Sequence, residues 1–171
     1  MSSIVIRPFD ARIDSIPAIT ALLHRAYEPL ATSGLHFVAA AQTDATTRKR
    51  MADGEALVSV RDDGTIVATA TWYPPGRTGG GTPWYERAGV AKFGQFAVDP
   101  AIQGQGHGRA LERFIARLAV ERGADELALD TSEKASKLIA MYLAWGYRHI
   151  EHCQWRTVNY RSVVMSRSVK E

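Results

Sequence analysis

One stretch of the sequence has residue types and spacing that suit anion binding, the loop Gln103-Gly104-Gln105-Gly106-His107-Gly108. A β-rich run precedes this loop, and the apolar stripe of a helix follows it. A helix that starts just after glycines presents unpaired backbone N–H groups, and its dipole favours negative charge at that end. Glycines also let a phosphate approach the backbone and allow a positive φ. The loop therefore predicts a phosphate site, although a plain tight turn can have the same composition.

Two common nucleotide-binding patterns do not fit this loop. The Walker pattern needs Lys followed by Ser or Thr, and the loop has neither at the required place. The dinucleotide fingerprint needs a third small residue, where this chain has Arg109. The loop also follows an antiparallel hairpin pattern instead of the first strand of a βαβ unit. Neither nucleotide-binding fold is favoured.

The elements that must position the loop can be predicted from periodicity and turn residues. β-rich runs predict strands over 4–6, 56–60, 66–72, 93–98, 126–130, 147–155 and 161–168. Apolar residues at helical spacing predict helices over 16–27, 111–118 and 138–145, and Thr43-Asp44 predicts a short helix through Met51. Pro29 and Gly34 should end the first helix. The segment 74–89 is rich in Gly and Pro, which predicts a mobile loop outside the core.

At the glycine loop the sequence resembles the GCN5-related N-acetyltransferase (GNAT) family. Its motif Gln/Arg-x-x-Gly-x-Gly/Ala is matched by Gln103, Gly106 and Gly108. The run Phe-Ala-Val-Asp-Pro at 96–100 is similar to the family's preceding strand, and 138–147 is similar to its later helix, which ends Tyr-x-x-x-Gly-Phe/Tyr. The motifs cover residues 93–150, and element order covers the rest.

The resemblance implies an α/β (α+β) fold with a mixed, mostly antiparallel central sheet of about seven strands. Helices would flank this sheet, and the fourth and fifth strands would splay apart in a V. The whole chain, 1–171, would be a single N-acetyltransferase domain.

The resemblance also implies how acetyl-CoA, the acyl donor, would be held. The backbone of Phe96, Ala97 and Val98 would pair with the pantetheine arm, and an N–H near Val98 could stabilise an oxyanion. The amides of 104–109 would hold the pyrophosphate, so the cofactor-binding residues of the loop are Gln103, Gly104, Gln105, Gly106, His107, Gly108 and Arg109. At His107 the useful group is the amide, not the imidazole. Many relatives have an Asn where this chain has Ala135, and Ser132, Ser136 or a water could replace its contact.

Two side chains are candidates for proton transfer. Tyr142 aligns with the family's usual general acid, which protonates the departing thiolate; the alternative is a tyrosine packed at the rim of the core. Asp130 matches the end of the strand where some members have a glutamate base, and it could instead make turn hydrogen bonds. Glu133 and a water held by Gln95 are weaker candidates for the base.

The acceptor pocket is less constrained by the sequence. Four aromatic residues bracket the glycine-rich part of the loop 74–89 and could wall such a pocket or anchor the loop on the sheet: Trp72, Tyr73, Trp84 and Tyr85. Tyr27 and His36 could contribute from the first helix and the turn after it. The basic cluster Arg48-Lys49-Arg50 is expected on the surface.

Composition limits the remaining classes. The 171 residues and 46% hydrophobic content suit one ordinary domain, and a formal charge of +3, spread along the chain, does not suggest a nucleic-acid partner. A single cysteine, Cys153, excludes an internal disulfide and a Cys-based zinc cluster, and no metal is expected. No apolar run suits a signal peptide or a membrane span, so a cytoplasmic location without a membrane partner is the default expectation. An edge in the two C-terminal strands could pair with a second copy, so a homodimer is a further expectation.

The predicted function is transfer of an acetyl group from the CoA thioester to a primary amine, by direct attack in a ternary complex. The acceptor, which could be a small molecule, a peptide or a protein, is not identified by the sequence. The alternative is a catalytically silent acyl-CoA-binding regulatory module, because loop and strand would serve binding even without an acid or base. The retained Tyr142 favours the enzyme.

Overall fold

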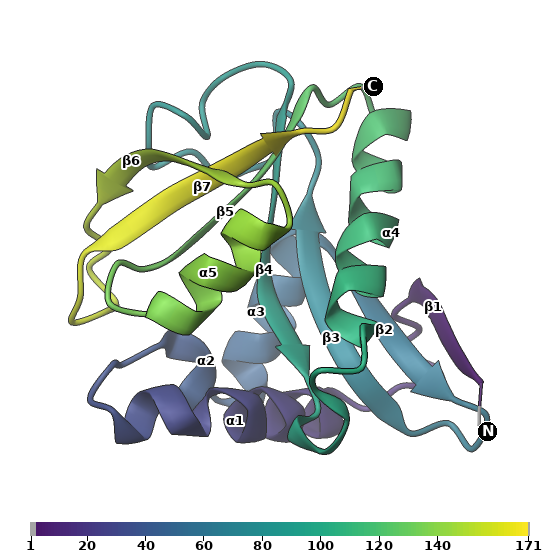
Figure 1. Ribbon diagram of the computed structural model, residues 1–171. Helices are drawn as coiled ribbons and strands as arrows, with labels where there is room; N and C mark the ends of the chain where they lie inside the picture. Colours follow the sequence, from purple (N-terminus) through teal and green to yellow (C-terminus); the bar gives the residue numbers. More distant parts are fainter. Residues whose placement is uncertain (1–2, 171) are drawn as a thin grey trace.

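A seven-stranded sheet forms the centre of the computed structural model, which describes residues 3–170 (Figure 1). The strand order is β1-β2-β3-β4-β5-β7-β6. The strands are β1 (Ile4–Pro8), β2 (Glu55–Arg61), β3 (Ile66–Tyr73), β4 (Val90–Val98), β5 (Glu126–Ser132), β6 (Arg148–Cys153) and β7 (Ser162–Ser168). Every neighbouring pair is antiparallel except β4 and β5, which are parallel. The predicted mixed, mostly antiparallel sheet is confirmed.

The parallel strands β4 and β5 stay together for only a short distance. Val90–Lys92 pairs with 126–128, and the pairing then ends. On its other side, β4 carries a bulge, because Gly94 faces Thr71 and Ala97 faces Thr69, which leaves two residues of β4 opposite one of β3. Gln95 in this bulge has a φ of 47°. A bulge bends its strand, and the two strands splay apart in Figure 1 as the predicted V.

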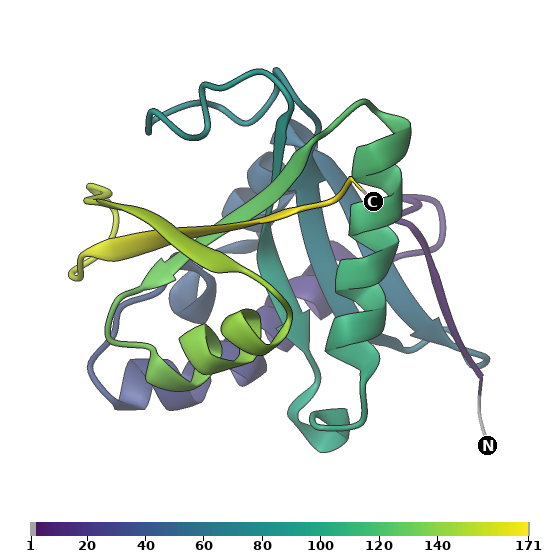
Figure 2. The same ribbon diagram turned by 45° about the horizontal axis from the view of Figure 1, so that its top comes forward.

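Helices cover both faces of the sheet (Figures 1 and 2). They are α1 (Ile16–Thr32), α2 (Val38–Ala41), α3 (Asp44–Asp53), α4 (His107–Glu121) and α5 (Ser136–Ala144). Successive residues of a strand point to opposite faces, so Leu57 joins the core under α4 and α5, whereas Val58 joins the core under α1 and α3. The site therefore rests on a sheet that is packed on both sides.

The first helix differs from its prediction. Ser15 caps it, since its Oγ accepts from Ala18 N, but the helix continues through Pro29 to Thr32. The predicted end at Pro29 is wrong, because proline has a φ compatible with a helix and costs only the N–H and the fit of one turn. The short helix after Thr43 is confirmed as α3, while α2 was not predicted.

The segment 74–89 is a loop, but the prediction that it lies outside the core is wrong for Tyr85. The side chain of Tyr85 is buried with Val90, Ala128 and Val164 on the face opposite α4 and α5. Its backbone oxygen accepts from Thr78 Oγ1 at 2.6 Å. An aromatic side chain therefore fastens this loop to the sheet.

No helix within residues 3–170 is both long and apolar enough to cross a membrane.

Candidate active site

The glycine loop leads into α4 as a row of free backbone amides. Gly106 caps the helix in the left-handed conformation, with φ 88°, and makes no side-chain cap. The first turn of α4 contains no acidic residue. Across residues 3–170, no backbone hydrogen bond in a turn, loop or cap has its donor between 103 and 109, and the next donor along the chain is Ala110 N, which donates to Gly106 O. The amides of 103–109 thus remain available to an anion at the positive end of the helix dipole.

The side chains of the loop leave this row of amides open. Gln103 donates from Nε2 to Val98 O at 3.0 Å. Arg109 donates to Glu112 at 2.7 Å and lies over the Trp145 ring. Gln105 is exposed and His107 is partly buried. A Cβ at Gly108 would meet Val98 Cγ2 at 3.3 Å, so a larger residue would press the helix away from β4.

The three β4 residues predicted to contact the pantetheine arm do not face the same way. Ala97 pairs with Thr69 of β3, and Asp99 N donates to Val67 O, also in β3. Phe96 and Val98 alternate with these two residues, so their backbone groups face the open side of β4. The Phe96 carbonyl already accepts from Tyr27 Oη at 2.9 Å, and the Val98 carbonyl accepts from Gln103. The N–H groups of Phe96 and Val98 are therefore the groups of this strand that remain for a ligand.

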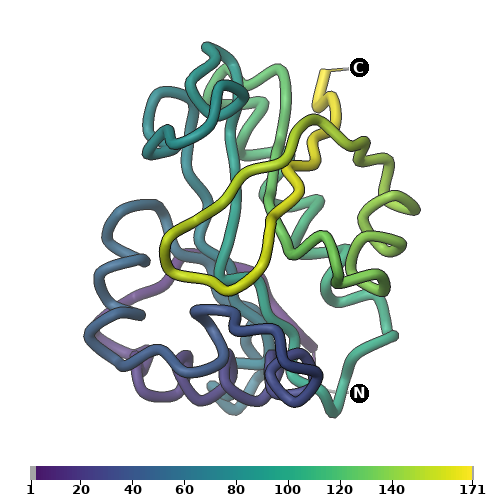
Figure 3. The backbone as a smooth tube through the Cα atoms, turned by 90° about the vertical axis from the view of Figure 1, so that its left-hand side faces the viewer, coloured from purple at the N-terminus to yellow at the C-terminus, as the bar shows by residue number. Residues whose placement is uncertain are grey.

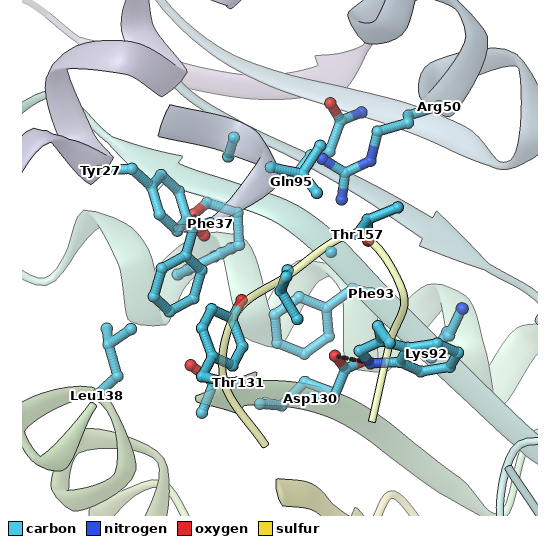
Figure 4. A pocket seen from close by; sticks show the side chains of 18 of the residues that line it. Tyr27, Phe37, Arg50, Lys92, Phe93, Gln95, Asp130, Thr131, Leu138 and Thr157 are labelled. Carbon is cyan, nitrogen blue, oxygen red and sulfur yellow. Dashed lines mark hydrogen bonds between the residues drawn. The ribbon is translucent and has the colours of Figure 1, made fainter. Parts of the chain in front are cut away.

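A cavity of about 410 Å³ lies beside the splayed strands (Figure 4). Its walls come from α1, α2, α3, β4, β5, α5 and the loop between β6 and β7. Tyr142 and Asp130 both line it, as do Phe93 and Phe96. The structure thus brings the two predicted proton-transfer residues to one cavity, while the loop 103–109 lies outside it at the far end of β4.

Tyr142 lies at the floor of this region among other aromatic rings. It is 5% exposed and packs edge-on against Phe93, Trp145 and Tyr147. Its hydroxyl makes no hydrogen bond to any residue between 3 and 170. Burial is the main cause that raises the pKa of Tyr142 well above its ordinary value near 10. The phenol therefore stays protonated at neutral pH and has its proton free for a ligand.

Asp130 is held by two neutral donors. Tyr85 Oη donates to Oδ1 at 2.7 Å, and Trp155 Nε1 donates to Oδ2 at 2.9 Å. Each carboxylate oxygen can accept more than one hydrogen bond, so both oxygens can still receive a proton from the cavity side. Lys92 lies close by, and burial lowers its pKa while the charge of Asp130 opposes this change.

The weaker candidates for the base are placed less favourably. The Gln95 side chain is buried, and its amide accepts from Gln42 and donates to Thr71, so both ends are occupied within the protein. Glu133 pairs with Arg161 at 2.7 Å and does not line the cavity.

Of the residues expected near the acceptor, Tyr27 lines the cavity, but Trp72, Trp84 and His36 do not. Burial raises the pKa of Tyr27 to about 12. Trp72 is buried in the core beneath α4, and Trp84 stacks with Arg87. His36 contributes its backbone N–H, which donates to Asn159.

Ala135 is buried, where many relatives have an Asn. Of its two proposed substitutes, Ser132 Oγ already accepts from Lys134 N, and Ser136 is exposed.

Sequence reasoning missed several residues of the cavity, among them Arg50, Lys92 and Trp155. Arg50 was expected on the surface with Arg48 and Lys49, but it lines the cavity, so this expectation is wrong for one member of the cluster. The helical spacing of α3 could have indicated the place of Arg50. Side chains one or two positions apart on a helix point in different directions, so Arg50 need not share the face of Arg48 and Lys49. Lys92 and Trp155 had no signal in the sequence, since they reach the cavity through a strand and a loop whose packing partners are distant in the chain.

Comparisons with known proteins agree on a family and a fold. The model described as acetyltransferase (GNAT) family matches residues 17–147, and no curated protein matches the sequence significantly. The chain is similar to the ribosomal-protein-S18-alanine N-acetyltransferase from Escherichia coli, at 18% identity and TM-score 0.71 over 99% of this chain and 96% of that one. A GCN5-related N-acetyltransferase from Kribbella flavida is 22% identical, with TM-score 0.71 and 96% and 97% of the two chains covered. YncA from Salmonella typhimurium, solved with its cofactor acetyl-CoA, is 17% identical, with TM-score 0.69 and coverage of 99% and 96%.

Proposed function

Because the chain belongs to the acetyltransferase (GNAT) family, it is an acyltransferase, and we propose that it moves an acetyl group from acetyl-CoA to a primary amine by direct attack in a ternary complex. The observation that carries this proposal is the arrangement along β4. Free amides lie at one end of the opening between β4 and β5, and a cavity with Tyr142 and Asp130 lies at the other. A long donor with an anionic end and a reactive end fits such an opening. We also propose that residues 1–171 work as one domain.

The residues present suit acetyl-CoA. The amides of 104–109, which have no protein acceptor in a turn, loop or cap, would hold its phosphates. The N–H group of Val98 would pair with its pantetheine arm, and the N–H group of nearby Phe96, which lines the cavity, would stabilise negative charge on the carbonyl oxygen during attack. When bound, acetyl-CoA supplies the acetyl group and a thiolate leaving group.

The proton transfers fall to two side chains in the proposed reaction. Asp130 would take a proton from the acceptor ammonium, so that the nitrogen gains a lone pair for attack on the carbonyl carbon. As the new C–N bond forms and the C–S bond breaks, Tyr142 would give its proton to the departing sulfur, and the second proton that the nitrogen loses would restore the phenol. Tyr85 and Trp155 would keep the Asp130 carboxylate in position through their hydrogen bonds.

Two measurements test the proposal. Thermal shifts with acetyl-CoA, ATP, NAD and DNA should show stabilisation by acetyl-CoA, by about 2.7 kcal/mol at a hundred times its Kd. An assay of free thiol with a broad panel of amines should show amine-dependent CoA release. Binding without release from any amine would contradict the proposed transfer, and equal stabilisation by the other ligands would contradict the proposed donor.

A further inference from the structure

The cavity has an excess of positive charge. Its lining includes three charged side chains, Arg50 from α3, Lys92 from β4 and Asp130 from β5. Figure 4 shows Arg50 beside Gln95 on one wall, away from Asp130 and Lys92 on another. One carboxylate therefore shares a partly enclosed space with two cations, Lys92 on its own wall and Arg50 on another. An acceptor amine brings a further positive charge, so an acceptor with no other charge would leave the cavity more positive still.

A buried polar network holds Arg50 in this wall. Arg50 donates from one terminal nitrogen to Gln42 Oε1 at 2.7 Å. The Gln42 amide nitrogen donates to Thr47 Oγ1 at 2.7 Å and to Gln95 Oε1 at 2.6 Å, which fixes the orientation of its oxygen toward Arg50. A guanidinium has five N–H donors in a planar fork. One is used by Gln42, and Arg50 forms no ion pair within residues 3–170, so the fork remains able to bind a carboxylate with two parallel hydrogen bonds.

Lys92 adds charge to the cavity without neutralising a partner. Its ammonium lies over the rings of Tyr73 and Tyr85, at 4.9 and 4.7 Å from their centroids. It forms no ion pair with any residue in the described part of the chain. Asp130, the nearest carboxylate on the cavity wall, already accepts from neutral donors at both oxygens. With two cations and one carboxylate in the lining, one positive charge is left for a ligand to balance.

Aromatic rings form a large part of the remaining wall. Phe37 contacts Tyr27 and Tyr160, with centroids 5.3 and 4.9 Å away. The loop between β6 and β7 lies across the opening toward the segment before α2 (Figure 3). Asn159 fastens it there, because its side chain accepts from His36 N and donates to Gly34 O. About 410 Å³ is at the small end of ligand cavities, so the space suits a small ligand with an apolar body.

From these observations we propose that the acceptor is a small amine that also carries a carboxylate on an apolar body, and that Arg50 binds this carboxylate. This inference rests on the proposed acetyl transfer. The amine would lie toward Asp130 and the thioester, the apolar body between the aromatic rings, and the carboxylate on the guanidinium fork. Amino acids with large apolar side chains are the simplest members of this class.

Binding of acetylated products tests the inference without any need for turnover. The probes are N-acetyl-L-phenylalanine and N-acetyl-L-leucine, each compared with its carboxamide, titrated calorimetrically into the protein with CoA present. At least one acid should bind about ten- to a hundredfold more tightly than its amide, because only the acid offers a charged acceptor to Arg50.

Two substitutions in α3 test whether Arg50 causes the preference for the acid. Arg50→Met should remove the preference for the acid and leave affinity for the amide nearly unchanged. Arg48→Met, at an exposed position of α3, should keep the preference, and the melting temperatures of both variants verify that they fold. Equal binding of acid and amide, no binding of any probe, or a preference that survives Arg50→Met would each overturn the inference.

Failure of the proposed function gives a different result. If the thiol assay detected efficient transfer to neutral amines, and the acids were not preferred, the acetyltransferase proposal would stand and the carboxylate inference would fall. If acids were preferred in binding but no amine released CoA, Arg50 would remain a carboxylate site and the proposed transfer would fall.

Discussion

Removing the Tyr142 hydroxyl should lower turnover while leaving the free energy of unfolding nearly unchanged. In Tyr142→Phe the ring and its edge-on contacts with Phe93 and Tyr147 remain. The lost hydroxyl has no partner within residues 3–170, so its removal should change the free energy of unfolding by less than about 0.5 kcal/mol. Loss of a general acid costs about 10²-fold in turnover, which equals about 2.7 kcal/mol of transition-state stabilisation. We therefore expect a large kinetic effect on an intact fold.

Tyr147→Phe is the matched control. Its hydroxyl donates to the fully buried carboxylate of Glu112 at 2.7 Å. Loss of a hydrogen bond to a charged group should cost about 1.5–3 kcal/mol of stability, while the chemistry should be little affected. Urea denaturation and the thiol assay on both variants would thus give opposite patterns.

The assay must isolate the chemical step. Single-turnover release of CoA should slow in Tyr142→Phe, and affinity for acetyl-CoA should change little, because the lost interaction develops in the transition state. Near-normal single-turnover rates in this variant would refute the reasoning. Tyr142 would then be a packing residue, and water would protonate the thiolate.

The pH dependence of Tyr142 follows from its environment. Burial raises its pKa above 10, so between pH 6 and 9 its proton is retained and turnover should show no decline from its ionisation. For a group whose folded pKa is raised, the stabilising contribution is complete below the unfolded pKa and is lost as pH rises through the folded value. The wild-type protein should therefore lose stability above pH 10 more steeply than Tyr142→Phe.

Three further predictions concern the loop, the base and an ion pair. Gly106→Val should abolish stabilisation by acetyl-CoA in thermal shifts, because a β-branched residue at φ 88° would cost about 1–3 kcal/mol or turn the free amides away. Asp130→Asn should lower turnover more at low pH than at high pH, since only a protonated amine needs a base. Asp14 is paired with Arg7 through two hydrogen bonds of 2.7 and 2.8 Å, and the pKa of Asp14 is lowered mainly by this hydrogen bonding. Its contribution, about 2 kcal/mol, should be present above pH 3.8 and be lost as pH falls through its folded pKa, and urea denaturation at pH 3 and 7 should show this.

Each of these three predictions has a control variant or a result that would contradict it. Gly64 has φ 87° and the same open surroundings in the turn between β2 and β3, so Gly64→Val should cost similar stability yet keep acetyl-CoA binding. Retained binding in Gly106→Val would remove the loop from the site. A uniform loss of turnover at all pH values in Asp130→Asn would indicate a structural role through Tyr85 and Trp155. The difference in stability between Asp14→Asn and the wild type should be smaller at pH 3 than at pH 7, and a constant difference between the two at every pH would contradict the ion-pair account.

Much of the fold could be predicted because local signals and tertiary packing agree. The turn at 62–64 lies between two β-rich runs, and the hairpin of β2 and β3 forms there. The end of α1 could not be predicted, because Pro29 lowers helix propensity but its carbonyl accepts from Ser33 N in the continued helix. The bulge at Gln95 was also hidden, since a glutamine at positive φ has no local signature.

The candidate site likewise has one part that the sequence predicts and another part that it does not. The loop and Tyr142 carry sequence patterns because backbone geometry and helix spacing require particular residues there. Lys92 carries none and Arg50 has only its position along α3, because both are held at the cavity by tertiary contacts that no sequence pattern specifies, with Gln42 and the rings of Tyr73 and Tyr85. A pattern common to a family can therefore indicate donor chemistry, whereas acceptor chemistry must be read from the individual cavity.

One buried hydrogen-bond network connects the bulge in β4 with Arg50 on the cavity wall. Gln95 occupies the bulge that bends β4, and its amide contacts Thr71 on one side and Gln42 on the other. Gln42 in turn accepts from Arg50. The bulge beside the proposed donor site thus shares a hydrogen-bond network with the wall on which the acceptor's carboxylate would lie. Because buried amides are costly to leave unpaired, a change in the bulge would disturb both sites together, and the geometry between donor and acceptor is set by a single cluster of side chains.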